Sequence, residues 1–524
     1  MSTIQTHASN TGASRAGARE WIALAVLMLP VLLVAIDNTV LAFALPQIAG
    51  ALEPTGAQQL WMVDVYPLVL AGLLVPMGVL GDRFGRRRLL MIGAVGFGVV
   101  SVLCAFAPTA EWLIAGRALQ GLFGATLMPS TMSLLRSLFL DRVQRRLAIA
   151  IWATGFSVGS AVGPSVGGLL LAHFWWGSIF LLAIPLLLPL LVLVPLLVRE
   201  SRDAAAPRVD LIGIVLAMLT LAPFAAAIKH LATDGIDVVA IGLVALAAAS
   251  GVLFVRRMDR AEHPMLDLAL LRDRAFSTGV LVNLLSVVAL VGFLFFLTQH
   301  LQLVVGMSTL EAALVLLPGT AAMILAGLGS VRLVRRIRQE VVMVGALVAS
   351  TIAYVTVAVL GADISVAAIA AAFALLGAGI GAAETLSNDL VLASAPVDKA
   401  GAAAGVSETA YELGAVLGTA VLGGILTAVY QATLVVPASI GAADAARAEE
   451  TLSGGIHVAD AVGGEAGAAL AEAARHAFDA GVVWTAGAGA LLIAAAAFLT
   501  WWRLVRGRDG RPSTAAIAIA EAER

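Results

Sequence analysis

Charged residues that interrupt long apolar runs are the side chains of this chain that could do chemistry. Asp37, Asp64 and Arg117 lie in apolar segments of the first half, and Glu408 and Glu412 lie in one of the second half. Each charge inside a membrane costs about 2.5 to 3.5 kcal/mol on insertion scales, so it usually marks an ion, proton or substrate site. We expect Asp37 and Arg117 to be neighbours whose carboxylate exchanges a proton. Asp64 is a further proton-coupling candidate, for which a solvated helix end is the alternative explanation.

The two glutamates of the second half form a pair. Glu408 and Glu412 are four residues apart and share a helix face, with Tyr411 beside them. Two close carboxylates repel each other and burial disfavours their charge, so at least one should bind a proton or a cation near neutral pH. A solvated position near a helix end is the alternative for Glu408. Glu384 is a weaker candidate for the same site, and Asp389 is expected near the inner face.

These carboxylates suit a lipophilic cation as cargo. Acidic groups neutralise its charge, and aromatic rings bind it by cation–π contact without a demanding hydrogen-bond pattern. The aromatic residues that could form the walls of such a site are Trp61, Tyr66, Trp152, Phe156, Phe293, Phe296 and Tyr411. Any one of them is more commonly a packing or lipid-facing residue.

The elements that position these side chains must be membrane-spanning helices. The 524 residues are 60% hydrophobic and 13% charged, with a mean hydropathy of +0.98, which a soluble protein of this length does not show. The apolar runs are continuous rather than alternating and suit helices of about 20 residues, not a β-barrel. We therefore predict an all-α polytopic membrane protein. Its fourteen expected spans are 21–44, 60–80, 89–107, 112–135, 147–171, 177–198, 211–230, 238–255, 276–297, 309–329, 341–360, 365–392, 401–430 and 482–504.

The distribution of positive charge sets the expected orientation. With the N-terminus inside, 28 of the 32 lysines and arginines fall on the cytoplasmic side, all except Arg117, Lys229, Arg447 and Arg475. Basic loops prefer that side, so both termini are predicted to be cytoplasmic. The spans then group as a tail (1–20), a six-helix bundle (21–198), two linker helices with their loops (199–275), a second six-helix bundle (276–504) with an external loop (431–481), and a tail (505–524). Partial helix within the external loop is left open.

Two glycine-rich motifs accompany the charges. The loop between the second and third spans carries Gly78, Gly81, Asp82, Arg83, Gly85, Arg86 and Arg87. We expect Asp82 to cap the next helix and to form an ion-pair latch, although a plain cytoplasmic turn would explain the arginines. The fifth span carries Gly159, Gly163, Pro164, Gly167 and Gly168. Glycines four residues apart share one face and allow close helix approach, and the proline should bend the helix.

These motifs together resemble the fourteen-span drug:proton antiporters of the major facilitator superfamily, of the QacA and SmvA type. The resemblance covers nearly the whole chain. It also rests on AIDNTVLAFALP from Ala35, on Arg117, Gln120, Gly121 and Gly124 in the fourth span, and on SETAYELGAVLG from Ser407. It implies two six-helix bundles plus two extra linker helices, proton coupling, and alternating-access export of quaternary ammonium compounds, dyes such as ethidium, and fluoroquinolones. Export of an endogenous lipid, siderophore or antibiotic by the same fold is the alternative.

Other functions find no support in the sequence. The chain has no phosphate-binding G-x-x-x-x-G-K-[ST] loop, and its seven histidines have no metal-ligand spacing. We expect neither an enzyme nor a resident cofactor, but a transporter driven by the proton gradient, with protons and small cations as partners and no nucleic acid. The single Cys104 cannot form an internal disulfide. A composition rich in Arg, Ala and Gly suggests a bacterial plasma membrane, where we expect a monomer in contact with lipid.

Overall fold

The computed structural model describes residues 16–139, 141–202, 210–233, 235–261, 268–361, 364–395 and 400–506, and these form helices joined by loops. The helices of the first part are α1 (Ala18–Leu52), α2 (Gly56–Phe84), α3 (Arg86–Ala105), α4 (Ala110–Leu138), α5 (Arg142–His173), α6 (Ser178–Leu181), α7 (Ala183–Leu197), α8 (Leu211–Thr233) and α9 (Val238–Arg260). The second part contains α10 (Leu268–Arg272), α11 (Arg274–Gln299), α12 (Thr309–Leu333), α13 (Gln339–Leu360), α14 (Val366–Ser394), α15 (Ala400–Leu417), α16 (Gly424–Thr433), α17 (Ala442–Glu450), α18 (Leu452–Val462) and α19 (Gly464–Thr500). Three π-helical segments follow α11, α15 and α19: η1 (His300–Val304), η4 (Gly418–Gly423) and η5 (Trp501–Val505).

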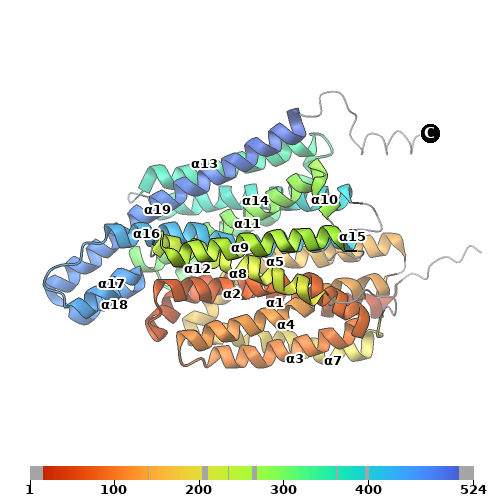
Figure 1. The fold of residues 1–524 in the computed structure, drawn as a ribbon, viewed down its shortest axis with the longest axis horizontal. Helices are drawn as coiled ribbons and strands as arrows, with labels where there is room; N and C mark the ends of the chain where they lie inside the picture. The colour runs from red at the N-terminus through yellow and green to blue at the C-terminus, as the bar shows by residue number, and fades with distance from the viewer. Residues whose placement is uncertain are drawn as a thin grey trace, which may run out of the picture.

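The long helices run roughly parallel to one axis and form two packed groups (Figure 1). In the first, α1 packs on α5 and α7, α2 on α4, and α3 on α4 and α7. In the second, α14 packs on α11, α12 and α13, while α19 packs on α11, α13 and α16. The helical pair α8 and α9 lies between the groups, where α8 contacts both α2 and α16. The fold class predicted from the sequence, an all-helical membrane protein, is confirmed.

Twelve helical segments within the described residues are long and apolar enough to cross a membrane. They include neither α4 nor α5, two long helices that run alongside the others. The structure is compatible with twelve to fourteen spans, and fourteen stays a prediction. The chain is multi-pass.

The two groups are joined at one end of the molecule and separate at the other. We call the end where the described chain begins and finishes the tail end, and the opposite end the far end (right and left in Figure 1). One apolar core at the far end includes Phe43 and Ile48 of α1 together with Phe296 and Leu301 of the second group. Towards the tail end the first group has a separate core around Phe139. The second group has a small core of its own, which consists of Leu270, Phe276, Val391, Ala403 and Val406.

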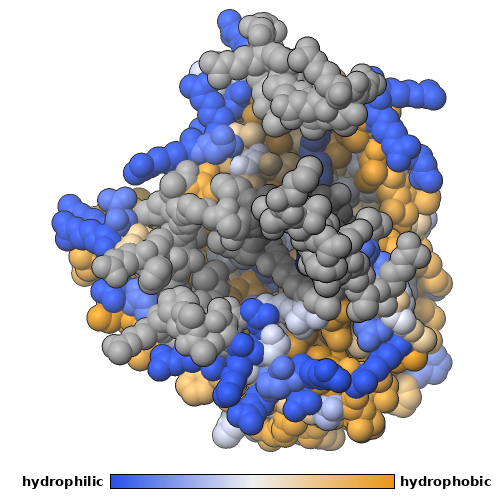
Figure 2. All heavy atoms as spheres, turned by 90° about the vertical axis from the view of Figure 1, so that its right-hand side faces the viewer, coloured by the Kyte–Doolittle hydropathy of each residue, from blue (hydrophilic) through white to orange (hydrophobic). Residues whose placement is uncertain are grey.

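Hydrogen bonds between the groups are found towards the far end. The hydroxyl of Thr298 donates to the carbonyl of Ala42 at 3.3 Å, and Gln47 donates to the hydroxyl of Thr309, also at 3.3 Å. At the tail end, hydrophilic side chains gather around the rim and apolar ones cover the sides (Figure 2). The groups are therefore fastened at the far end.

The segment 431–481, expected as an external loop with partial helix left open, contains helices. It folds into the short helices α17 and α18, and α19 begins at Gly464 rather than near residue 482. The hairpin of α17 and α18 projects beyond the far end (Figure 1). Its Arg447 forms an ion pair with Glu53 at 2.5 Å, and Glu450 accepts a hydrogen bond from the amide of Gly56 at 3.1 Å. Its polarity fits a position outside the apolar bundle.

Candidate functional site

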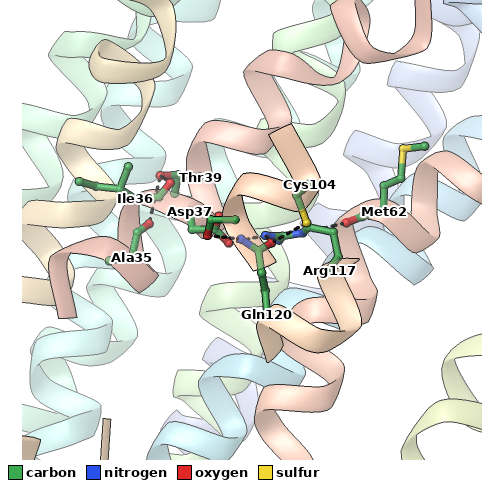
Figure 3. A network of polar contacts seen from close by, with 9 residues as sticks. Ala35, Ile36, Asp37, Thr39, Met62, Cys104, Arg117 and Gln120 are labelled. Carbon is green, nitrogen blue, oxygen red and sulfur yellow. Dashed lines mark hydrogen bonds and ion pairs between the residues drawn. The ribbon is translucent and has the colours of Figure 1, made fainter. Parts of the chain in front are cut away.

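A buried ion pair joins α1 to α4, as the sequence predicted. Nη1 of Arg117 lies 2.5 Å from Oδ2 of Asp37, and the two side chains are 1% and 8% exposed. The guanidinium also donates to Oε1 of Gln120 at 3.1 Å and to the carbonyl of Met62 at 3.3 Å (Figure 3). Gln120 in turn donates to the hydroxyl of Ser101 at 2.9 Å. Every charge in this network therefore has a partner, which buried charges require.

Glycines bring the helices of the site close together. A Cβ at Gly121 of α4 would lie 2.7 Å from the carbonyl of Tyr66 on α2, and one at Gly159 of α5 would lie 2.6 Å from the Cβ of Ala35 on α1. The small residue therefore permits each approach, as in other membrane helix pairs. The remaining glycines of the fifth-span motif continue this contact: Gly163 meets Thr39, Gly167 meets Val40, and Gly168 meets Ala313 of α12. The motif face thus packs α5 between the two groups, while the side chain of Pro164 lies outside the described residues and α5 is one continuous helix through that position.

Glu412 of α15 is the second charge of the site. The residue is fully buried, and neither carboxylate oxygen receives a hydrogen bond of ordinary geometry from a described residue. Asn38 of α1 is close enough to act as a weak donor, and the negative charges of Glu408 and Asp37 act on the same carboxylate. Among the described residues, no cation forms an ion pair with Glu412 in the way that Arg117 does with Asp37.

The groups from the two halves converge on Tyr66. Its ring lies 4.4 Å below the guanidinium carbon of Arg117. The charges of Asp37, Glu412 and Glu408 all act on this buried phenol, whose hydroxyl has no hydrogen-bond partner among the described residues. The fold therefore places the predicted proton-coupling pair and the predicted cation-binding glutamates beside each other across the interface between the halves.

The other predicted acids differ in their burial and in whether their charges act on Tyr66 and Glu412. Glu408 is partly buried and one of its oxygens is inaccessible to solvent, so it is not a simple solvated helix end. Glu384 on α14 is similarly enclosed, but its charge is not among those that act on Tyr66 or Glu412. Asp64 of α2 is completely buried, which contradicts the solvated alternative.

Three aromatic residues form a bridge between the halves, and two others do not. Trp152 and Phe156 of α5 have ring centroids 5.7 Å apart, and Phe156 lies 6.1 Å from the ring of Tyr411 on α15. These rings are placed to line the interface. Phe293 and Phe296 lie 4.8 Å apart and are fully buried in the apolar core that both groups share at the far end, so they are packing residues.

The loop after α2 folds differently from its prediction. Asp82 lies inside α2, and the residue that precedes α3 is Gly85 with φ of +112°, so Asp82 does not cap α3. The side chain of Asp82 lies outside the described residues, and its latch role stays a prediction. Glu200, beyond α7, instead accepts hydrogen bonds from the amides of Arg87 and Arg88 at 3.0 and 3.1 Å. A Cβ at Gly85 would lie 2.8 Å from this carboxylate, which explains the glycine.

The other residues of the loop motif also make their contacts within the first part of the chain. The amide of Arg86 donates to the carbonyl of Ser201 at 3.0 Å, and Arg87 donates to the carbonyl of Val198 at 3.1 Å. Gly78 and Gly81 face α4 through contacts with Pro129 and Ser130, and Arg83 is exposed.

Two residues of the site were not predicted from the sequence. Asn38 is adjacent to Asp37 but faces Glu412, and Glu200 follows an apolar span like any other loop acid. Their partners lie far away in the chain, so no local pattern identifies them. Among the described residues, no group of three His, Cys, Asp or Glu side chains could hold a metal ion.

Comparison with known proteins agrees with this architecture. The profile described as Major Facilitator Superfamily matches residues 27–419. The chain belongs to the major facilitator superfamily. As a major facilitator it is a transporter rather than an enzyme, and the family resemblance seen in the motifs is confirmed.

Two relatives and one solved structure match this major facilitator over nearly its whole length. The multidrug efflux pump LfrA of Mycolicibacterium smegmatis is 52% identical over 484 residues, 92% of this chain and 96% of the relative. The methyl viologen resistance protein SmvA of Salmonella typhimurium is 34% identical over 500 residues, 94% of this chain and 99% of the relative. A bacterial homologue of the human lysosomal transporter Spinster, inward-facing and unoccupied, has a TM-score of 0.61 at 18% identity and covers 95% of this chain and 99% of that one. The last comparison supports the fold alone.

Proposed function

We propose that this protein is a proton-coupled multidrug efflux antiporter that exports lipophilic cations. The observation that carries the proposal is the buried Glu412, which no cation of the described part of the chain pairs with, next to the Asp37–Arg117 pair. A buried carboxylate is stabilised when either a proton or a cation neutralises its charge, and so it can exchange one for the other. The identity of 52% to a multidrug efflux pump along nearly the whole chain supports the same assignment.

The proposed cargo follows from the surroundings of Glu412. Tyr411 and Phe156 offer aromatic faces beside it, and Glu408 adds a second carboxylate one turn away. Such a site selects charge and hydrophobic surface rather than a particular pattern of hydrogen bonds. Quaternary ammonium compounds, ethidium and fluoroquinolones are the proposed substrates. Glu384 is proposed only as an outlying acid, because its charge does not act on the cluster.

Alternating access is the proposed mechanism. We assign the tail end to the cytoplasm because most of the arginines lie in its loops, as the positive-inside rule requires. The present state, with the halves fastened at the far end, then opens inward. A cation binds at Glu412, the halves rock, and an external proton displaces it. Asp37 exchanges its proton within the same cycle, and Arg117 stabilises its charged form. The contacts of Thr298 and Thr309 with α1 must break each time.

The proposed organisation is two six-helix bundles joined by α8 and α9. We propose a bacterial plasma membrane protein with both termini inside, acting as a monomer and using the proton gradient rather than a cofactor. Asp64, the loop motif with Asp82 and the fifth-span motif with Gly163 serve proton coupling and the conformational change in this scheme.

Ethidium efflux from cells or inverted vesicles tests the proposal. We expect efflux by the wild type that a protonophore abolishes, and its loss in Asp37→Asn and in Glu412→Gln. Glu111→Gln is the matched control, because Glu111 is an exposed acid at the far end that receives a hydrogen bond from Gln58. Efflux that survives the protonophore would refute proton coupling. The absence of cation efflux by a folded wild type would instead favour export of an endogenous metabolite.

A further inference from the structure

A cavity at the tail end lies apart from the proposed transport site. It has a volume of about 820 Å³ and opens between the start of α11 and the end of α19. Its lining consists of Leu271, Arg272, Arg274, Ser277, Trp502, Arg503 and Arg506. Residues more than 200 positions apart in the sequence thus form one concave surface. α10 and the end of α19 lie at the same corner of the molecule (Figure 1).

The cavity carries an excess of positive charge. Only Arg272 has a carboxylate nearby among the described residues, Asp259 at 3.9 Å, while Arg274, Arg503 and Arg506 form no ion pair with any described residue. Asp273 is adjacent in sequence, but it already caps α11 by accepting from the amide of Phe276 at 2.8 Å. Four guanidinium groups around one hollow repel each other unless an anion binds there, and planar guanidinium groups match phosphate oxygens.

The position of the cavity points to the membrane interface. It lies where α19 passes from its apolar stretch into η5, next to Trp501 and Trp502, which are 39% and 54% exposed. Tryptophans of this kind gather at the level of the lipid headgroups. One turn earlier Phe498 is 61% exposed and Leu491, further along, is 75% exposed. An apolar surface for acyl chains therefore continues directly from the arginines.

We propose that this cavity binds the phosphodiester headgroup of an anionic phospholipid, with Arg274, Arg503 and Arg506 on the phosphate and Trp502 against the glycerol and upper acyl chain. Basic pockets between membrane helices are suited to such headgroups. A free phosphate ion would use the arginines but would gain nothing from the exposed apolar surface beside them. The binding is independent of drug transport, so ethidium efflux is not its readout.

Tryptophan quenching by brominated lipid tests the proposal with the full chain. The purified protein is placed in nanodiscs of phosphatidylcholine that contain increasing brominated phosphatidylglycerol or, in parallel, brominated phosphatidylcholine. The chain has nine tryptophans, so the signal of Trp502 is the difference between the wild type and Trp502→Phe. We expect this signal to be half-quenched at a much lower fraction of the anionic lipid than of the neutral one.

Substitution of two arginines sharpens the test. Each basic residue near an anionic surface contributes roughly a fivefold preference, so Arg503→Gln with Arg506→Gln should raise the half-quenching fraction about 25-fold. The lysine pair Arg503→Lys with Arg506→Lys should keep most of the preference, which shows that the altered helix end still folds. The control is Arg256→Gln with Arg260→Gln, because these exposed arginines lie at the end of α9, outside the cavity.

Three outcomes would overturn the proposal. Equal quenching of Trp502 by the anionic and neutral lipids would show that no headgroup is selected. An equal effect of the control pair would show that only the general charge of the tail end matters. Release of the brominated lipid by millimolar inorganic phosphate, but not by chloride at the same ionic strength, would identify free phosphate as the ligand.

Discussion

Because Asp37 and Arg117 are both buried, breaking their ion pair should lower the stability of the folded protein. Asp37→Asn keeps the shape of the side chain but leaves the charge of Arg117, which is 1% exposed, without its carboxylate. Removing one member of a buried ion pair costs about 3 to 5 kcal/mol. The hydrogen bonds from Arg117 to Gln120 and Met62 remain, so we expect the lower end, about 3 kcal/mol.

The chain contains its own probe for this loss. Cys104 is its single cysteine, is 1% exposed, and lies 3.7 Å from Oε1 of Gln120 in the same network. A maleimide therefore reacts only when this part of the protein opens. When opening is at equilibrium, a loss of about 3 kcal/mol raises the labelling rate roughly 100-fold.

An exposed ion pair of the same length serves as the control. Glu53 and Arg447 are also 2.5 Å apart, but their side chains are 52% and 48% exposed. Glu53→Gln should change the labelling rate by less than about fivefold, since exposed pairs contribute at most about 1 kcal/mol. The double variant Asp37→Asn with Arg117→Gln should label more slowly than Asp37→Asn, because no buried charge remains. Equal rates for Asp37→Asn and Glu53→Gln, or additive effects in the double variant, would refute the reasoning.

Two further predictions concern packing and pH. Gly163→Ala should destabilise the protein by about 1 to 3 kcal/mol, measured by the thermal midpoint in detergent, because its new Cβ overlaps Thr39 of α1. Gly487→Ala, with open space around it, should leave the midpoint unchanged, and equal midpoints for the two would count against close packing as the reason for the motif. Arg257 donates hydrogen bonds to Asp210 and holds the pKa of that carboxyl below its ordinary value. The pair therefore stabilises the folded protein at pH values above the pKa of unfolded aspartate, which is near 3.9. This stabilisation is lost as the pH falls through the lower pKa of Asp210 in the folded protein. The difference in midpoint between the wild type and Asp210→Asn should therefore be present at pH 7 and shrink on acidification below about pH 4, whereas a constant difference would contradict the charge argument.

Local sequence was sufficient for the class of protein and for many of its helices. Runs of about 20 apolar residues have no other stable arrangement in lipid than a helix, so composition and run length indicated the all-helical fold. The spacing of Gly159, Gly163 and Gly167 likewise specified one helix face, because the period of a helix is a local property. The sixth span was located correctly but is divided into α6 and α7 around Leu182.

Local sequence was less informative where polar segments or aromatic residues have several uses. The polar segment 431–481 was expected as an external loop with partial helix left open, and the sequence did not locate the helices that it forms, α17, α18 and the first turns of α19. Phe293 and Phe296 were candidates for a cargo site and are core residues instead. The hydrophobicity of such a side chain predicts that it is buried. It does not predict whether the side chain packs against another helix or lines a cavity.

Sequence alone thus determined that Asp37, Arg117, Glu408 and Glu412 lie within apolar helices, where a charge is too costly to be incidental. The sequence also predicted that Asp37 and Arg117 are neighbours, and the structure shows their direct contact across 80 positions of chain. Only the tertiary structure decided that Glu412, from the other half, meets this pair beside Asn38 and Tyr66. The physical reason is that an apolar stretch of sequence around a charged residue already shows that the charge will be buried. Which side chain then forms an ion pair or hydrogen bond with it depends on which helices pack together.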